Sequence, residues 1–289
     1  MSAYELLAAF GGGLFGGLIG GVNAFIFTGI TALCGIAVLL STGSTAVLDN
    51  IAFGPFFAPN IAFVGGVAAV AYAGRKMRKA KAAGEKGYDI DVQGNNITLP
   101  MFGTMDPSVL LVGGIFGVMG YVINYVFVNY VPFSFDTAAF AVLICCVISR
   151  LVFGETGILG KYPEGEKRYS DMTGKFILYT ILWGFAIGAL NGFVCIKLNV
   201  PFVGFAISAA SLIFLYIGKP FTSTHHVTMV SGYAALAFAN PVLAGVFGAI
   251  AALTGEYLQR TTNTHVDSHI DREATTIFIW SLIILTFLS

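Results

Sequence analysis

Two stretches of sequence carry the strongest signal for the fold. Residues 16–25 read Gly-Gly-Leu-Ile-Gly-Gly-Val-Asn-Ala-Phe, and residues 184–193 read Gly-Phe-Ala-Ile-Gly-Ala-Leu-Asn-Gly-Phe. They share Gly, Ile, Gly, Asn and Phe without a gap. Closely spaced glycines in apolar sequence are typical of helices that pack backbone to backbone in lipid. The match therefore predicts an internal repeat built from membrane helices.

The composition of the chain indicates an all-α integral membrane protein. Of its 289 residues, 56% are hydrophobic and only 10% are charged, against about a quarter charged in soluble domains. Fifteen basic residues balance fifteen acidic ones, so there is no basic stripe for nucleic acid, and we expect a lipid bilayer as the surroundings. Apolar segments of about 20 residues predict a polytopic bundle of about nine spans, at 5–28, 29–48, 57–76, 108–130, 135–153, 174–197, 201–218, 228–258 and 274–288.

The distribution of basic residues predicts the orientation of the spans. Eleven of the fifteen basic residues lie within 75–86 and 150–175, so the positive-inside rule places loops 75–107 and 150–175 in the cytoplasm. We expect a multi-pass protein of the cell membrane, with the polar segment 265–271 on the extracytoplasmic side.

A second match supports an inverted repeat. Phe57-Ala-Pro-Asn60 and the helix to Gly74 align with Phe238-Ala-Asn-Pro241 and the helix to Gly255. The first copy begins at the first predicted span and the second at the sixth, so the copies have opposite topology, as in many secondary transporters. The predicted organisation is a first repeat at 1–76, a cytoplasmic loop with a β-hairpin at 77–107, an inserted helix pair at 108–153, a cytoplasmic loop at 154–173, a second, inverted repeat at 174–258, and a polar loop with a final span at 259–289.

Each copy contains a segment whose helix is broken or re-entrant by its Pro and Asn content. Pro59-Asn60 and Asn240-Pro241 begin helices there, and a helix N-terminus offers free N–H donors to a polar group. This pairing resembles in concept the Asn-Pro-Ala half-helices of aquaporins, over about a fifth of the chain, although the order is Pro-Asn in one copy and Asn-Pro-Val in the other. The alternative is that these residues only cap and kink helices.

Further polar residues in apolar sequence are candidates for the lining of a path. Asn23 and Asn191 lie deep in helices, where the alternative role is a hydrogen bond between helices. Asp49 with Asn50 would serve ion coupling or else cap a helix. Adjacent His225 and His226 diverge on a helix, so at most one faces a path; the alternative is a pair at the membrane surface.

The segment His265-Val-Asp-Ser-His-Ile-Asp271 has the spacing of a metal site if it is helical. Its candidate ligands are His265, Asp267 and His269. The alternative is that Asp271 caps the last helix.

These patterns together predict a membrane permease or channel for a small polar solute or ion. The path would lie at the interface of the two inverted repeats. No nucleotide-binding or nucleophile motif is present, so we expect no enzyme activity and no cofactor beyond such a metal ion. Two alternatives stay open: a membrane-embedded metal-dependent enzyme using the C-terminal His/Asp cluster, and a non-catalytic subunit of a larger complex. The glycine-rich faces would also serve a homo-oligomer.

Overall fold

The computed structural model describes residues 1–289 as an all-helical protein without strands. The first five α-helices are α1 (Ala3–Ile19), α2 (Gly21–Thr42), α3 (Val64–Ala83), α4 (Pro107–Tyr130) and α5 (Thr137–Phe153). The second five are α6 (Gly174–Leu198), α7 (Val203–Ser211), α8 (His225–Phe238), α9 (Pro241–Thr262) and α10 (Arg272–Leu282). Short π-helical turns occupy 48–52, 59–63 and 283–288, and 3₁₀ turns occupy 101–104 and 212–217.

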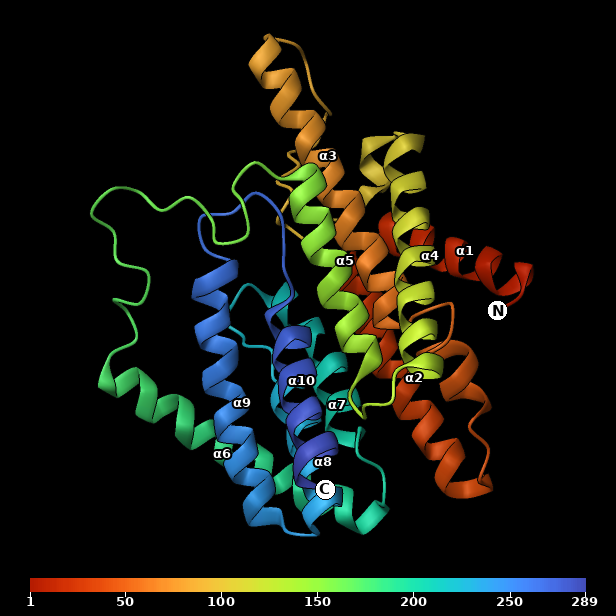
Figure 1. Cartoon of the computed structure of the whole chain (residues 1–289). Coiled ribbons are helices and arrows are strands. Elements are labelled where there is room, and N and C mark those ends of the chain that lie inside the picture. Colours follow the sequence, from red (N-terminus) through yellow and green to blue (C-terminus); the bar gives the residue numbers. More distant parts are fainter.

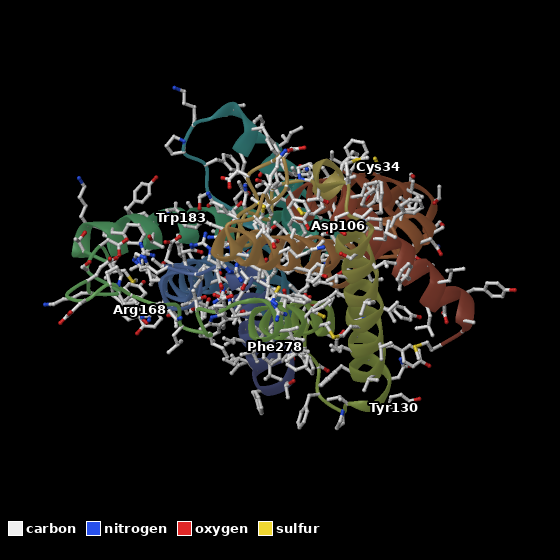
Figure 2. The ribbon with its side chains drawn as sticks, turned by 90° about the horizontal axis from the view of Figure 1, so that it is seen from above. Cys34, Asp106, Tyr130, Arg168, Trp183 and Phe278 are labelled. Atoms are coloured by element: carbon white, nitrogen blue, oxygen red, sulfur yellow. The ribbon has the colours of Figure 1, made fainter.

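The two halves of the chain, α1–α5 and α6–α10, have matching pairs of neighbouring helices. Helix α1 packs on α3 and α4, and α6 packs on α8 and α9. Helix α5 packs on α3 and α4, and α10 packs on α8 and α9. The halves meet through α2 against α7 and α5 against α10. In Figure 1, α1 and α6 run across the bundle on opposite sides of the molecule. Seen from above, Cys34 and Tyr130 lie toward one side, and Arg168 and Trp183 toward the other (Figure 2).

Glycine is required where these transverse helices cross their neighbours. A Cβ atom on Gly13 of α1 would lie 2.4 Å from the carbonyl oxygen of Gly113 in α4. A Cβ atom on Gly188 of α6 would lie 2.9 Å from the Cα atom of Gly248 in α9. Both helix pairs thus approach each other to backbone contact, which is the packing that the glycine-rich sequence predicts.

Four helices are long and apolar enough to cross a membrane, and they indicate a membrane protein. They are α2, α4, α6 and α9; α1, α5 and the segment Val203–Ile217 are apolar but shorter. Many large apolar side chains on these helices are exposed.

Two of the predicted spans are broken. The expected span 5–28 divides at Gly20, whose φ of 94° ends α1 before α2 begins. The expected span 228–258 divides at Ala239, which has a φ of 49°, and at Asn240, which caps α9. Phe238 stacks on Phe247 with ring centroids 5.7 Å apart, so the chain reverses and α9 returns alongside α8.

This reversal changes the predicted position of residues 265–271. The loop lies at the same end as the basic segments, not at the opposite end as expected (Figure 1). Arg78 at the end of α3 contacts Asp267 at 3.2 Å. Arg150 of α5 is 1% exposed and donates a hydrogen bond to Ser268 Oγ. It also donates to the carbonyl oxygens of Gly157, Ile158, Thr262 and Ser268. The chain reversal between α8 and α9 therefore brings the C-terminal end of α3, the 154–173 loop and the 263–271 loop to one face of the protein, which we call the loop face.

The predicted β-hairpin in 77–107 is absent. The carbonyl oxygen of Ile97 accepts a hydrogen bond from the N–H group of Val22 in α2, 3.1 Å away. Val92 and Met101 are buried against α3 and α4. The alternating apolar residues pack on helices, so they do not form a strand pair.

The glycine contacts predict the effect of adding a single methyl group. A Cβ atom at Gly16 would lie 1.8 Å from the carbonyl oxygen of Ala62, whereas one at Gly11 meets nothing within 4 Å. Gly16→Ala should overpack this contact and lower the free energy of unfolding of the detergent-purified protein by about 1–3 kcal/mol. Its melting temperature should fall accordingly. Gly11→Ala is the matched control and should leave stability unchanged or raised. Equal melting temperatures for the two variants would contradict this helix packing.

The shared loop face predicts which cysteines react from the same side of a membrane. In a Cys34→Ser background, Glu85→Cys and His265→Cys should both react with an impermeant maleimide in vesicles of one orientation. Phe133→Cys, between α4 and α5, should react in vesicles of the opposite orientation. Labelling of His265→Cys together with Phe133→Cys would show that α8 and α9 form one continuous span.

Candidate functional site

A cavity of about 760 Å³ lies where the two halves meet. Most of its lining is apolar, with phenylalanines from both halves, including Phe25, Phe63, Phe135 and Phe205. Its polar and charged lining includes Asn60, Asn124, Asp136, Thr137, Ser223, His225, Tyr233, Gln259, His269, Asp271, Arg272 and Glu273. An apolar cavity with a few convergent polar groups is the usual form of a small-molecule site.

The first turns of four helices lie at this cavity. Asn60 belongs to the π-helical turn that leads into α3, and His225 is the first residue of α8. Asp136 caps α5 and accepts a hydrogen bond from the N–H group of Ala139 at 2.8 Å. Asp271 caps α10 in the same way. Each half contributes two helix N-termini, whose partial positive charge stabilises these carboxylates.

One group of polar residues surrounds Asp136. The hydroxyl group of Tyr233 donates to Asp136 Oδ2 at 2.9 Å. The N–H group of Asp136 donates to Ser281 Oγ at 2.9 Å. Thr137 donates to Asn124 Oδ1 at 2.7 Å. No Lys, Arg or His contacts the Asp136 carboxylate within ion-pair distance, so neutral hydrogen bonds and the start of α5 compensate its charge.

A second group contains a histidine, two carboxylates and an arginine. One ligand atom from each of His225, Asp271 and Glu273 can be chosen so that all three lie within 4.8 Å of one another. Arg272 Nε contacts Glu273 Oε1 at 2.7 Å, and its Nη1 contacts Glu256 Oε1 at 3.0 Å. The three potential ligands are each only 7% exposed. These ionisable groups are thus held together inside the protein.

The structure brings only part of the predicted path to the cavity. Pro59, Asn60 and His225 line it, and Asn60 Nδ2 donates to the carbonyl oxygen of Gly120. His226 is buried outside the lining and would lie 2.6 Å from a Cβ atom on Gly255 of α9.

Asn23 and Asn191 form hydrogen bonds between segments outside the cavity lining. Asn23 Oδ1 accepts from Tyr216, and Asn191 Nδ2 donates to the carbonyl oxygen of Thr228 at 2.6 Å and to Ser231 Oγ at 2.9 Å. Both therefore have the helix-to-helix contacts that were the alternative prediction.

Asp49, Asn50, Asn240 and Pro241 also lie outside the cavity lining. Asp49 is exposed and accepts a hydrogen bond from Thr45, while Asn50 donates to the carbonyl oxygen of Ala46. Asn240 is exposed and accepts from two N–H groups at the start of α9, with Pro241 as the first helical residue. Asn240 and Pro241 form the helix start that was their alternative prediction, whereas Asp49 and Asn50 lie in the π-helical turn 48–52, which has no side-chain cap.

The structure does not bring the predicted metal ligands His265, Asp267 and His269 into one group. Their loop is not helical. His265 Nε2 contacts Glu166 at 2.7 Å. Partial burial acts to raise the pKa of Asp267, but hydrogen bonds from Thr156 and Glu155 and the nearby Arg78 outweigh it and lower the pKa. Asp267 is thus a loop anchor, and only His269 reaches the cavity.

Sequence reasoning did not select Asp136, Tyr233, Arg272 or Glu273 for the site. The available signal was an acidic residue directly before an apolar helix, as in Phe135-Asp136-Thr137 and Ile270-Asp271-Arg272. That pattern reads first as a helix cap, and capping is one of the functions that Asp136 and Asp271 perform here.

The fold and the cavity together define a class: an all-helical membrane protein with a mostly apolar cavity between its two halves, into which a few polar and charged side chains converge. Comparison with protein-family models places the chain in a particular family. Residues 1–174 and 178–288 match the model of a family of unknown function, DUF7973, and the chain belongs to this family. No curated protein and no solved structure matches the chain.

Proposed function

We propose that this chain is a membrane permease or channel for a small polar solute or ion, with a path through the central cavity. The observation that carries the proposal is that four helix N-termini, two from each half, lie at one cavity. In secondary transporters, helix ends near the middle of the membrane bind the substrate at the interface of two repeats.

The proposed halves are inverted repeats of five helices each, α1–α5 and α6–α10. Support comes from helix direction. Helix α3 ends at the loop face, where Arg78 contacts Asp267. Helix α9 also ends there, because Arg260 contacts Asp171 of the 154–173 loop at 2.7 Å. Since α8 is antiparallel to α9, α8 ends at the opposite face from α3.

The sequence supports pairing α3 with α8. Residues 64–72 read Val-Gly-Gly-Val-Ala-Ala-Val-Ala-Tyr, and residues 230–238 read Val-Ser-Gly-Tyr-Ala-Ala-Leu-Ala-Phe. The capped Asp-Pro start of α4 at 106–107 corresponds to the Asn-Pro start of α9 at 240–241. This pairing replaces the one expected from the sequence, which matched 57–74 with 238–255. It also makes α4 and α5 part of the first repeat instead of an inserted pair.

The proposed orientation in the cell membrane follows from the loop face. The C-terminal end of α3 and the 154–173 loop carry most of the basic residues, and basic loops remain in the cytoplasm. We propose that the loop face is cytoplasmic, with 263–271 included. Loops 75–107 and 150–175 are then both cytoplasmic, which is the location predicted from their basic residues.

The cavity chemistry supports a small cargo with hydrogen-bonding capacity. Neutral donors and acceptors such as Asn60, Asn124 and Tyr233 are available beside apolar walls. Such a lining discriminates by size and by hydrogen bonding.

A transport assay on purified protein in liposomes tests this function. Stopped-flow light scattering with urea and glycerol would measure solute flux, and planar-bilayer recording in KCl would measure current. We expect flux or current above that of empty liposomes. Met229→Trp, which adds bulk to a cavity-lining side chain, should reduce it strongly.

Leu182→Trp is the matched control, because Leu182 is 61% exposed on α6. It should conduct as the unaltered protein does. If the protein is no more permeable than empty liposomes to every probe, or if both tryptophan variants conduct equally, the permeation path is not this cavity.

A further inference from the structure

Three side chains at the cavity have ligand atoms without a hydrogen-bond partner. Nδ1 of His225 is buried and unpaired. Asp271 uses Oδ1 to cap α10, and Oδ2 accepts no hydrogen bond. Glu273 accepts through Oε1 from Ser223 and Arg272, and Oε2 accepts none. Buried polar atoms without partners are costly and rare in folded proteins, so the buried Nδ1 atom of His225 calls for a partner. The two carboxylates with unused oxygen atoms line the same cavity.

We propose that His225, Asp271 and Glu273 bind a divalent first-row transition-metal ion in the cavity. The inference concerns metal binding, and it holds whether or not the chain transports a solute. One imidazole nitrogen with two carboxylate oxygens is a donor set suited to zinc, manganese or iron. Magnesium and calcium prefer sites made of oxygen alone, so the histidine favours the transition metals.

The spacing of the three ligands is close to that around one ion. Ligand atoms stand about 2.0–2.2 Å from such an ion, so any two lie at most about twice that distance apart. The atoms of His225, Asp271 and Glu273 lie within 4.8 Å of one another. Ligand atoms around a tetrahedral ion lie about 3.4 Å from one another, so side-chain movements of about 1 Å close the site.

The charges around the site favour a bound cation. The one cationic side chain in contact with Glu273 is Arg272, and Glu256 shares its guanidinium group. Asp271 has no arginine or lysine partner; its nearest basic group is His269 Nε2, 3.6 Å from Oδ2. A negative charge excess inside a protein is stabilised by a metal ion. His269 Nε2 also lacks a hydrogen-bond partner, and it is the closest candidate for a fourth ligand.

The surroundings of His225 hold its ring in place. The ring packs on Phe25 and Phe205, with centroids 4.7 and 6.1 Å away. A ring oriented by packing loses little freedom when it binds an ion. These contacts also allow His225→Phe to remove the nitrogen ligand while an aromatic ring remains against the same neighbours.

The test is zinc binding to the full-length, tag-free protein in detergent, measured by equilibrium dialysis in a Cys34→Ser background. Cys34 is the exposed cysteine, and its removal excludes binding by an exposed thiolate. We expect one zinc ion per chain. His225→Phe and Asp271→Asn should each weaken binding by about tenfold or more. Asn is itself a good helix cap, so Asp271→Asn keeps the start of α10.

His226→Gln is the matched control, because His226 is adjacent in sequence but lies outside the cavity lining. It should bind zinc as the parent does, and size-exclusion profiles should show all variants folded. Absence of stoichiometric zinc binding by the parent, or parent-like affinity in folded His225→Phe and Asp271→Asn, would overturn the proposal. Because this assay needs no liposomes, its result is independent of the transport assay.

Discussion

The chain reversal between α8 and α9 determines the relation between the two halves. Ala239 adopts a positive φ, and the Asn240 side chain caps the N–H groups at the start of α9. Pro241 is suited to this first helical position because its fixed φ is helical and it has no N–H group. Without this turn α9 would continue away from the loop face, and Asp271 and Glu273 could not lie beside His225. The turn formed by Ala239, Asn240 and Pro241, at the face opposite the loop face, thus positions the ionisable groups of the cavity.

The interior of the protein combines apolar walls with a few buried charges. Such charges are expensive inside a membrane protein and mark functional positions. Here Asp136 and Asp271 are placed at helix N-termini, where the helix dipole lowers that cost. Arg150 has a different role, because its guanidinium group is saturated by carbonyl oxygens and a serine at the loop face. The first two carboxylates face the cavity, whereas Arg150 joins α5 to two loops.

Composition and glycine spacing were sufficient to predict a helical membrane protein with close helix packing. The sequence showed an irregularity at Asn240-Pro241 but predicted an unbroken span through Gly20, and only tertiary contacts decide whether a break kinks a helix or reverses it. Because the reversal between α8 and α9 was not predicted, the 265–271 segment was assigned to the wrong end of the bundle relative to the basic loops. For the cavity, Asn60 and His225 were predicted. Asp136 and Glu273 were not, because a capping carboxylate looks the same in sequence whether or not it lines a cavity.

The decisive measurement is an experimental structure of the protein in a lipid nanodisc, at side-chain resolution, because it shows directly whether the chain reverses between α8 and α9 and whether a cavity separates the halves. We expect α8 and α9 to be antiparallel and a cavity between the halves to be lined by Asn60, Asp136, His225 and Asp271. A continuous helix through Asn240, or side chains filling the space between α5, α8 and α10, would contradict this expectation.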